Sequence, residues 1–192
     1  GAAAGGAPAG AATGVLSAER LPRATNARDL GRIPDLAGEV VYAAVACGGG
    51  VVCEVVALQN DTCRVHVFDP DTDQTLLLTT LAIHSARVVF AGSDFWVVGQ
   101  SSANDDIQGF NFDPTTDETL AGPTTLVALV GRVNDLAVAQ TGASDFTTAH
   151  ATSTTVRANR FNAAGSVQSS FNVTVAGTSI EAVACWLSRI SG

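Results

Sequence analysis

Phe68-Asp69-Pro70-Asp71-Thr72 is a stretch that returns twice along this 192-residue chain. Its counterparts are Phe112-Asp113-Pro114-Thr115-Thr116 and Phe161-Asn162-Ala163-Ala164-Gly165, so the phenylalanines are 44 and 49 residues apart. A second marker, a valine among small residues, recurs at intervals of 44, 49 and 45 residues, at Val45, Val89, Val138 and Val183. Because two separate markers recur at the same intervals, the chain contains a true internal repeat.

Each repeat contains four short runs rich in Val, Leu and Phe, and the connectors carry Gly, Asn, Asp and Pro. Runs of this kind between turn-forming residues predict β-strands. In the first unit we expect strands at 40–47, 51–58, 63–69 and 74–80. In the second unit we expect them at 86–91, 94–99, 106–113 and 118–128. In the third unit they fall at 134–140, 144–151, 154–162 and 166–175, and residues 179–187 begin a fourth unit.

Four antiparallel strands in about 45 residues is the blade unit of a β-propeller. The Phe-Asp-Pro-x-Thr marker also resembles the outer-hairpin turn of many propeller repeats, F/Y-D-P-x-T-G, although Asp73 and Asp117 replace the glycine here. The first strand of each unit is built from Ala, Val and Cys, which suits the narrow space near a propeller axis. We therefore predict an all-β, propeller-like repeat domain over residues 38–192.

The N-terminal region differs from the rest of the chain. Residues 1–14 are Gly/Ala-rich, and we expect a flexible segment there. Residues 15–37 contain Arg20-Leu21-Pro22 and Arg32-Ile33-Pro34, and proline at this interval prevents a continuous helix. An extended arm is expected, whose apolar side chains need a partner's surface. The predicted assembly residues are Leu16, Arg20, Leu21, Leu30, Arg32, Ile33 and Leu36.

The arm sequence Gly14-Val-Leu-Ser-Ala-Glu-Arg-Leu-Pro22 resembles the G-x-L-x-x-x-R-[IL]-P repeats in shafts of bacteriophage tail fibres. That resemblance implies three intertwined chains, a virion or extracellular location, and a role in host attachment. The implied partners are copies of this chain in a trimer, other appendage subunits, and a cell-surface glycan or protein receptor. An ordinary proline-containing linker is the alternative interpretation of the arm.

Three units and one further strand are too few to close a ring, because propellers use about 4–8 blades. The chain also begins with Gly1 rather than methionine. We therefore expect a longer polypeptide or an assembly of several copies.

The charge pattern excludes some classes of partner. The net charge is −8, and the positive charge lies on ten scattered arginines, with no lysine. This composition argues against a nucleic-acid binder or an anionic-membrane binder. No apolar run reaches the ~18–20 residues that span a bilayer, so no membrane insertion is expected.

Asp69, Asp71 and Asp73 have the D-x-D-x-D spacing of a calcium loop. The glycine and glutamate that complete an EF-hand are replaced by Gln74 and Thr80, so a solvated turn is the main interpretation and weak calcium binding the alternative.

No other group of residues suggests a cofactor or a reaction. Cys47 and Cys185 fit small buried positions of first strands, and the alternatives are a Cys47–Cys53 or Cys53–Cys63 disulfide, or a metal-binding or catalytic role. The three histidines, His66, His84 and His150, share no motif, and Trp96 suits a core better than a sugar site.

We predict a non-enzymatic structural or receptor-binding component of a phage-like tail fibre. A fragment of a secreted or surface propeller that binds a glycan or protein is the alternative.

Overall fold

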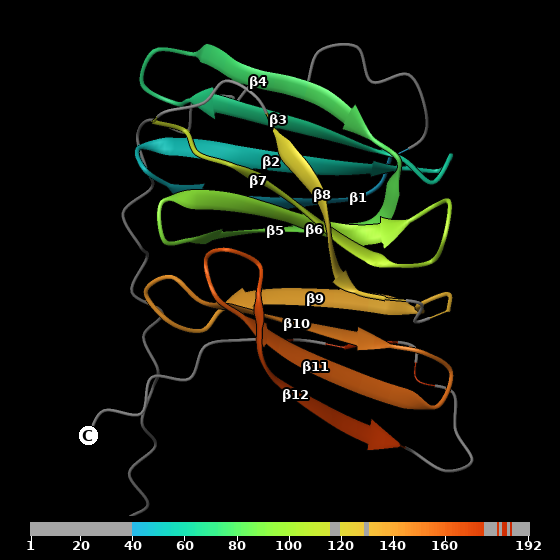
Figure 1. The fold of residues 1–192 in the computed structure, drawn as a ribbon. Helices are drawn as coiled ribbons and strands as arrows, with labels where there is room; N and C mark the ends of the chain where they lie inside the picture. The colour runs from blue at the N-terminus through green and yellow to red at the C-terminus, as the bar shows by residue number, and fades with distance from the viewer. Residues whose placement is uncertain are drawn as a thin grey trace, which may run out of the picture. The chain divides into compact units, whose positions relative to one another are not determined.

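The computed structural model describes residues 40–115, 120–128, 131–174, 180, 182–183 and 185. All regular structure in this part of the chain is β-strand, arranged as three four-stranded antiparallel sheets (Figure 1). The first sheet contains β1 (Val40–Gly48), β2 (Val51–Leu58), β3 (Cys63–Asp69) and β4 (Gln74–Leu81). The second contains β5 (Ile83–Ala91), β6 (Asp94–Ser101), β7 (Ile107–Phe112) and β8 (Ala121–Val127). The third contains β9 (Asp135–Gln140), β10 (Phe146–Ala151), β11 (Thr155–Phe161) and β12 (Val167–Thr174).

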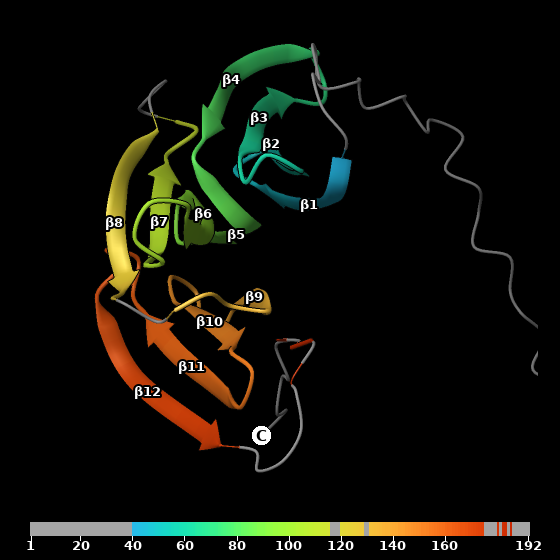
Figure 2. The ribbon, with the colours of Figure 1, turned by 90° about the vertical axis from the view of Figure 1, so that its right-hand side faces the viewer.

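The strand order within every sheet follows the chain, so each repeat forms one meander. The first strands β1, β5 and β9 lie toward one side of the stack, and β4, β8 and β12 form its opposite margin (Figure 2). Successive sheets pack face to face, as blades do. The predicted all-β, propeller-like architecture of residues 40–174 is therefore confirmed.

The predicted strand positions agree with the structure to within a few residues. Strand β5 extends furthest beyond its predicted range. It begins at Ile83 rather than residue 86, because a bulge between His84 and Arg87 lets Ile83 pair with Ser101. Ser85 lies at this bulge with a φ of 51°, a conformation that few non-glycine residues adopt.

The hairpin turns explain why the repeat markers recur. Gly49 and Gly50 join β1 to β2 with φ values of 59° and 81°, which is the left-handed pair that a two-residue hairpin turn requires. At the β3–β4 turn, Asp69 Oδ1 accepts hydrogen bonds from the amides of Asp71 (2.8 Å) and Thr72 (3.3 Å). In the other two sheets Asp113 Oδ1 accepts the amide of Thr115, and Asn162 Oδ1 accepts those of Ala164 and Ser166, so the bond from the amide two residues on is common to all three turns. The Phe-Asp marker is thus a turn capped by its own side chain.

Strand pairing corrects one detail of the repeat. Phe68, Phe112 and Phe161 are equivalent, because they pair with Val52, Phe95 and Phe146 in the same position of each sheet. The equivalent of Val45 is Val88 rather than the predicted Val89. The reason is that the connection from β6 to β7 is one residue longer than that from β2 to β3.

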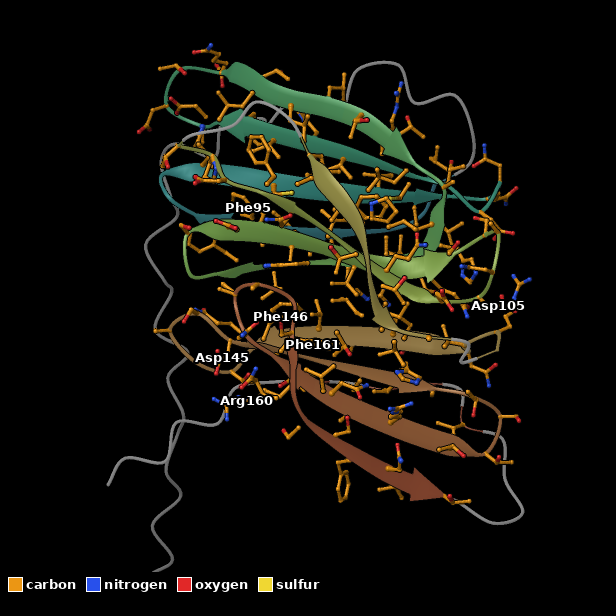
Figure 3. The ribbon with its side chains drawn as sticks, in the orientation of Figure 1. Phe95, Asp105, Asp145, Phe146, Arg160 and Phe161 are labelled. Atoms are coloured by element: carbon orange, nitrogen blue, oxygen red, sulfur yellow. The ribbon has the colours of Figure 1, made fainter. Side chains whose placement is uncertain are left out.

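Two apolar cores join the sheets. The first core lies between the first and second sheets and includes Cys53, Val55 and Val65 opposite Phe95 and Val97, all fully buried. The second core lies between the second and third sheets around Trp96, whose ring centroid is 5.1 Å from that of Phe146. The Phe146 ring in turn stacks on Phe161 at 5.2 Å (Figure 3). The prediction that Trp96 belongs to a core is confirmed.

The expected fourth unit over 179–187 is seen only in part. Its described residues form no strand, but they lie against the third sheet: the Ile180 amide donates to the Ser153 carbonyl (3.1 Å) and the Val183 amide to Asp135 Oδ2 (2.9 Å). The segments 1–14 and 15–37, with Leu16, Arg20, Leu21, Leu30, Arg32, Ile33 and Leu36, lie outside the described residues.

Candidate functional site

The outer face of the first sheet, which points away from the second sheet, exposes apolar side chains. Because side chains alternate along a strand, Tyr42, Ala44 and Ala46 face the second sheet, and the residues between them face outward. On this outer face Val41 is 59% exposed, Val45 63% and Leu78 39%. Strand pairing places Glu54 and His66 on the same face between Val45 and Leu78, so its exposed apolar side chains alternate with polar ones.

Cys47 also lies on the first outer face and is exposed, so the prediction that it is a small buried residue is wrong. Its position in β1 points it away from the sheet interface. Cys53 and Cys63 are the buried cysteines, and burial raises the pKa of the Cys63 thiol to about 12.

Neither predicted disulfide is present, and strand geometry explains why. Cys47 and Cys53 lie on opposite faces of the first sheet. Cys53 pairs with Val67 whereas Cys63 pairs with Ala57, which separates the two thiols along the strands by far more than a disulfide can span.

The outer face of the third sheet carries the most exposed large apolar side chain of the described residues. Phe171 on β12 is 66% exposed, and Val173 on the same face is 41% exposed. Strand pairing places Phe171 beside Ala158, and Ser169 beside Arg160. Sequence reasoning missed Phe171, although its alternation with Ser170 and Asn172 in a predicted strand was the available signal.

A hollow of about 480 Å³ opens on this third outer face. The residues around it come from the β9–β10 loop and from β10, β11 and β12, and they are Thr141, Thr147, Ala158, Arg160, Ser169, Ser170 and Phe171.

The repeat explains why the third sheet is hollow where the second is filled. The pair Phe146–Phe161 is equivalent to Phe95–Phe112, so Thr147 stands in the position that Trp96 occupies in the second sheet. The Trp96 indole fills that place and packs on the following sheet. A threonine side chain is much smaller, and its position is left open.

An ion pair lies at the edge of the hollow. Arg160 on β11 donates from Nε (3.1 Å) and from Nη2 (2.5 Å) to Oδ2 of Asp145, the last residue of the β9–β10 loop (Figure 3). The equivalent position in the second sheet has no cation, because there Asn111 Nδ2 donates to Asp94 Oδ2 at 3.2 Å. The Arg160 side chain is 49% exposed and that of Asp145 24%. The third sheet therefore presents a polar, charge-balanced edge beside an exposed aromatic ring.

A polar chain links the first strands of the three sheets. The Arg87 guanidinium lies 4.3 Å from the centre of the Tyr42 ring, and its Nη2 is 3.1 Å from Asp135 Oδ1. Asp135 also accepts the amides of Leu136 and Val183. The partners come from β1, β5 and β9, so this chain holds neighbouring sheets together rather than presenting free groups to a ligand.

We expect the phenol of Tyr42 to ionise at a higher pH than an exposed tyrosine does. Burial raises its pKa to about 12, and the nearby Arg87 only partly offsets that effect. Tyr42 is the sole tyrosine, so ultraviolet absorbance of the phenolate reports it directly. The folded-state pKa lies above the ordinary value of about 10, so the associated stability is present below pH ~10 and is lost as the pH rises through 12. A titration midpoint near 10 in the folded protein would contradict this placement.

The histidines do not form a common site. His66 is buried on the outer face of the first sheet, where its Nε2 lies 3.0 Å from Thr75 Oγ1 and its ring stacks on Phe68. His150 is buried on the face of the third sheet that meets the second, and burial, with the nearby Arg157, lowers its pKa to about 4. His84 belongs to β5.

The predicted calcium residues form part of a hairpin turn. The Asp69 carboxylate accepts backbone amides, which lower its pKa, and Asp73 adopts a φ of 59°. In the part of the chain that the structure describes, no three metal-ligating side chains converge. This geometry favours the solvated turn, and calcium binding at Asp69, Asp71 and Asp73 stays a prediction.

Among solved structures, the chain is similar in fold to a propeller. That structure, described as "Structure of Dos1 propeller", is 13% identical, with a TM-score of 0.48 over 72% of this chain and 37% of that chain. The chain thus spans little more than a third of that propeller. No protein-family model matches the sequence, and no curated protein matches it.

Among the described residues there is no helix with the length and apolar character to cross a membrane.

Proposed function

We propose that this protein is a non-enzymatic structural and receptor-binding component of an extracellular assembly, of the phage tail-fibre or virion-appendage kind. In this proposal the arm over 15–37 and the first outer face mediate assembly. The hollow on the third outer face binds a receptor. The partners are copies of this chain, in a trimer as the arm sequence suggests, and other subunits of the appendage.

The exposed apolar first outer face is the observation that carries the assembly role. Val45 and Leu78 lie on a sheet whose opposite face packs against the second sheet, and the second and third sheets use the equivalent face to bury their phenylalanines. Apolar surface of this kind is stabilised by removal from water, at roughly 25 cal/mol per Å². The arm immediately precedes β1 in the sequence, which supports a shared role.

A charge on the first outer face is expected to weaken association. Val45→Asp and Leu78→Asp together should raise the concentration at which the chain associates by at least about tenfold, because each aspartate would lose hydration in the contact. Sedimentation velocity over a range of protein concentrations measures this shift.

Val173→Asp is the matched control, since it places the same charge on an exposed valine of the third sheet. It should leave association unchanged. Equal behaviour of the Val45→Asp/Leu78→Asp variant and the unmodified chain would refute the assembly role of the first outer face.

A further inference from the structure

The hollow of the third sheet has the chemistry of a small-ligand site, and we propose that it binds a neutral saccharide through Phe171, Asp145 and Arg160. This inference rests on the proposed receptor-binding role and names the class of receptor. The hollow measures about 480 Å³, within the range of roughly 300–1,000 Å³ typical of ligand sites.

The aromatic part of the site is the Phe171 ring. It stands two-thirds exposed on β12, directly opposite Ala158, whose methyl group leaves the space beside the ring open. One face of a pyranose ring carries mainly C–H bonds, and such a face is covered favourably by an aromatic ring. Contact with the C–H face of a sugar is therefore more favourable for the exposed Phe171 ring than contact with water.

The polar part of the site lies two residues away on the adjacent strand. Arg160 uses Nε and Nη2 on a single oxygen of Asp145, so Asp145 Oδ1 and Arg160 Nη1 remain available as an acceptor and a donor. Neighbouring sugar hydroxyls need one acceptor and one donor at close spacing. The hydroxyls of Thr141 and Thr147, 3.1 Å apart, add further partners on the same side.

The charge balance favours a neutral sugar over an acidic one. Arg160 is already paired with Asp145, and the chain carries a net charge of −8. A carboxylated or sulfated sugar would have to compete with Asp145 for the guanidinium. Thr147 and Ala149 replace the Trp96 and Val98 of the second sheet, so the third outer face is less apolar than the equivalent face of the second sheet. The Cys185 thiol lies beside it, 3.9 Å from the Thr147 carbonyl oxygen.

The test is a glycan array carrying neutral and acidic saccharides, followed by titration calorimetry of the complete chain with the best neutral binder. We expect binding of neutral saccharides, and a loss of affinity of about threefold to tenfold in Phe171→Ala, with Phe171→Tyr close to the unmodified chain. Arg160→Gln should weaken binding similarly. Val173→Ala, which removes an exposed apolar side chain of β12 outside the hollow, should not.

Three results would overturn the saccharide site: no neutral saccharide bound, binding of acidic saccharides only, or affinity unchanged in Phe171→Ala. Circular dichroism of each variant checks that it is folded, and the exposed position of Phe171 makes unfolding unexpected. Sedimentation of the same samples separates the two proposals. Normal association without saccharide binding would refute only the saccharide site, whereas saccharide binding by a chain that never associates would refute only the assembly role.

Discussion

Trp96→Ala is expected to lower the free energy of unfolding by about 3–5 kcal/mol, the loss typical of truncating a fully enclosed aromatic side chain. The indole is 2% exposed and fills the space between the second and third sheets, against Phe146. A methyl group added at Gly109 or Gly165 would come within 2.9 and 2.8 Å of the indole, so the ring is enclosed on both sides. Its removal would leave a cavity that the two flanking sheets cannot easily close.

Urea unfolding followed by circular dichroism measures this loss, because the variant lacks one of the two tryptophans that would report by fluorescence. Phe171→Ala is the matched control, since it removes an aromatic side chain that is 66% exposed, and it should change the unfolding free energy by less than about 0.5 kcal/mol. Similar losses in the two variants would mean that the second and third sheets do not pack as described.

Gly48→Ala is expected to destabilise the junction of the first and second sheets by about 1–3 kcal/mol. A Cβ atom at Gly48 would overlap the ring of Phe90. Phe90 is held in place by an edge-to-face contact with Phe95, with 4.9 Å between the ring centroids. The ring must therefore move or the β1–β2 hairpin must shift.

A double-mutant cycle with Phe90→Ala isolates this contact. In the Phe90→Ala background the clash partner is gone, so Gly48→Ala should cost much less than in the unmodified chain. If the cost of Gly48→Ala is the same in both backgrounds to within about 0.5 kcal/mol, the close approach of Gly48 and Phe90 is not present in solution.

The fold was predictable because its signals are local. Turn residues and alternating apolar runs recur in each unit, and the Phe-Asp turn is held by one side chain and its neighbouring amides. The one-residue error at Val89 arose because a spacing count cannot say which connection carries an extra residue. Strand pairing across the sheet decides that, and pairing is not visible in a single run of sequence.

The candidate site could not be predicted in the same way. Thr147 is an ordinary strand residue in the sequence. Only strand pairing shows that it occupies the position equivalent to Trp96, where its smaller side chain leaves the hollow. Arg160 and Asp145 are 15 residues apart, and they meet because β10 and β11 form a hairpin. Cys47 looked like a core residue by composition, but its position in β1 points it outward. In each case the tertiary neighbour, rather than the residue type, sets the role.

The central claim is that the first outer face is a contact surface, and Cys47 is a reporter placed on it. Cys47 is exposed, Cys53 and Cys63 are buried, and Cys185 is half-buried near the Thr147 carbonyl of the third sheet. The most direct measurement is therefore the rate of alkylation of Cys47, followed by peptide mass spectrometry, in dilute and concentrated protein. The rate at Cys47 should fall as the chain associates, while that at Cys185 stays constant. An alkylation rate at Cys47 that is independent of protein concentration would contradict the proposed assembly through this face.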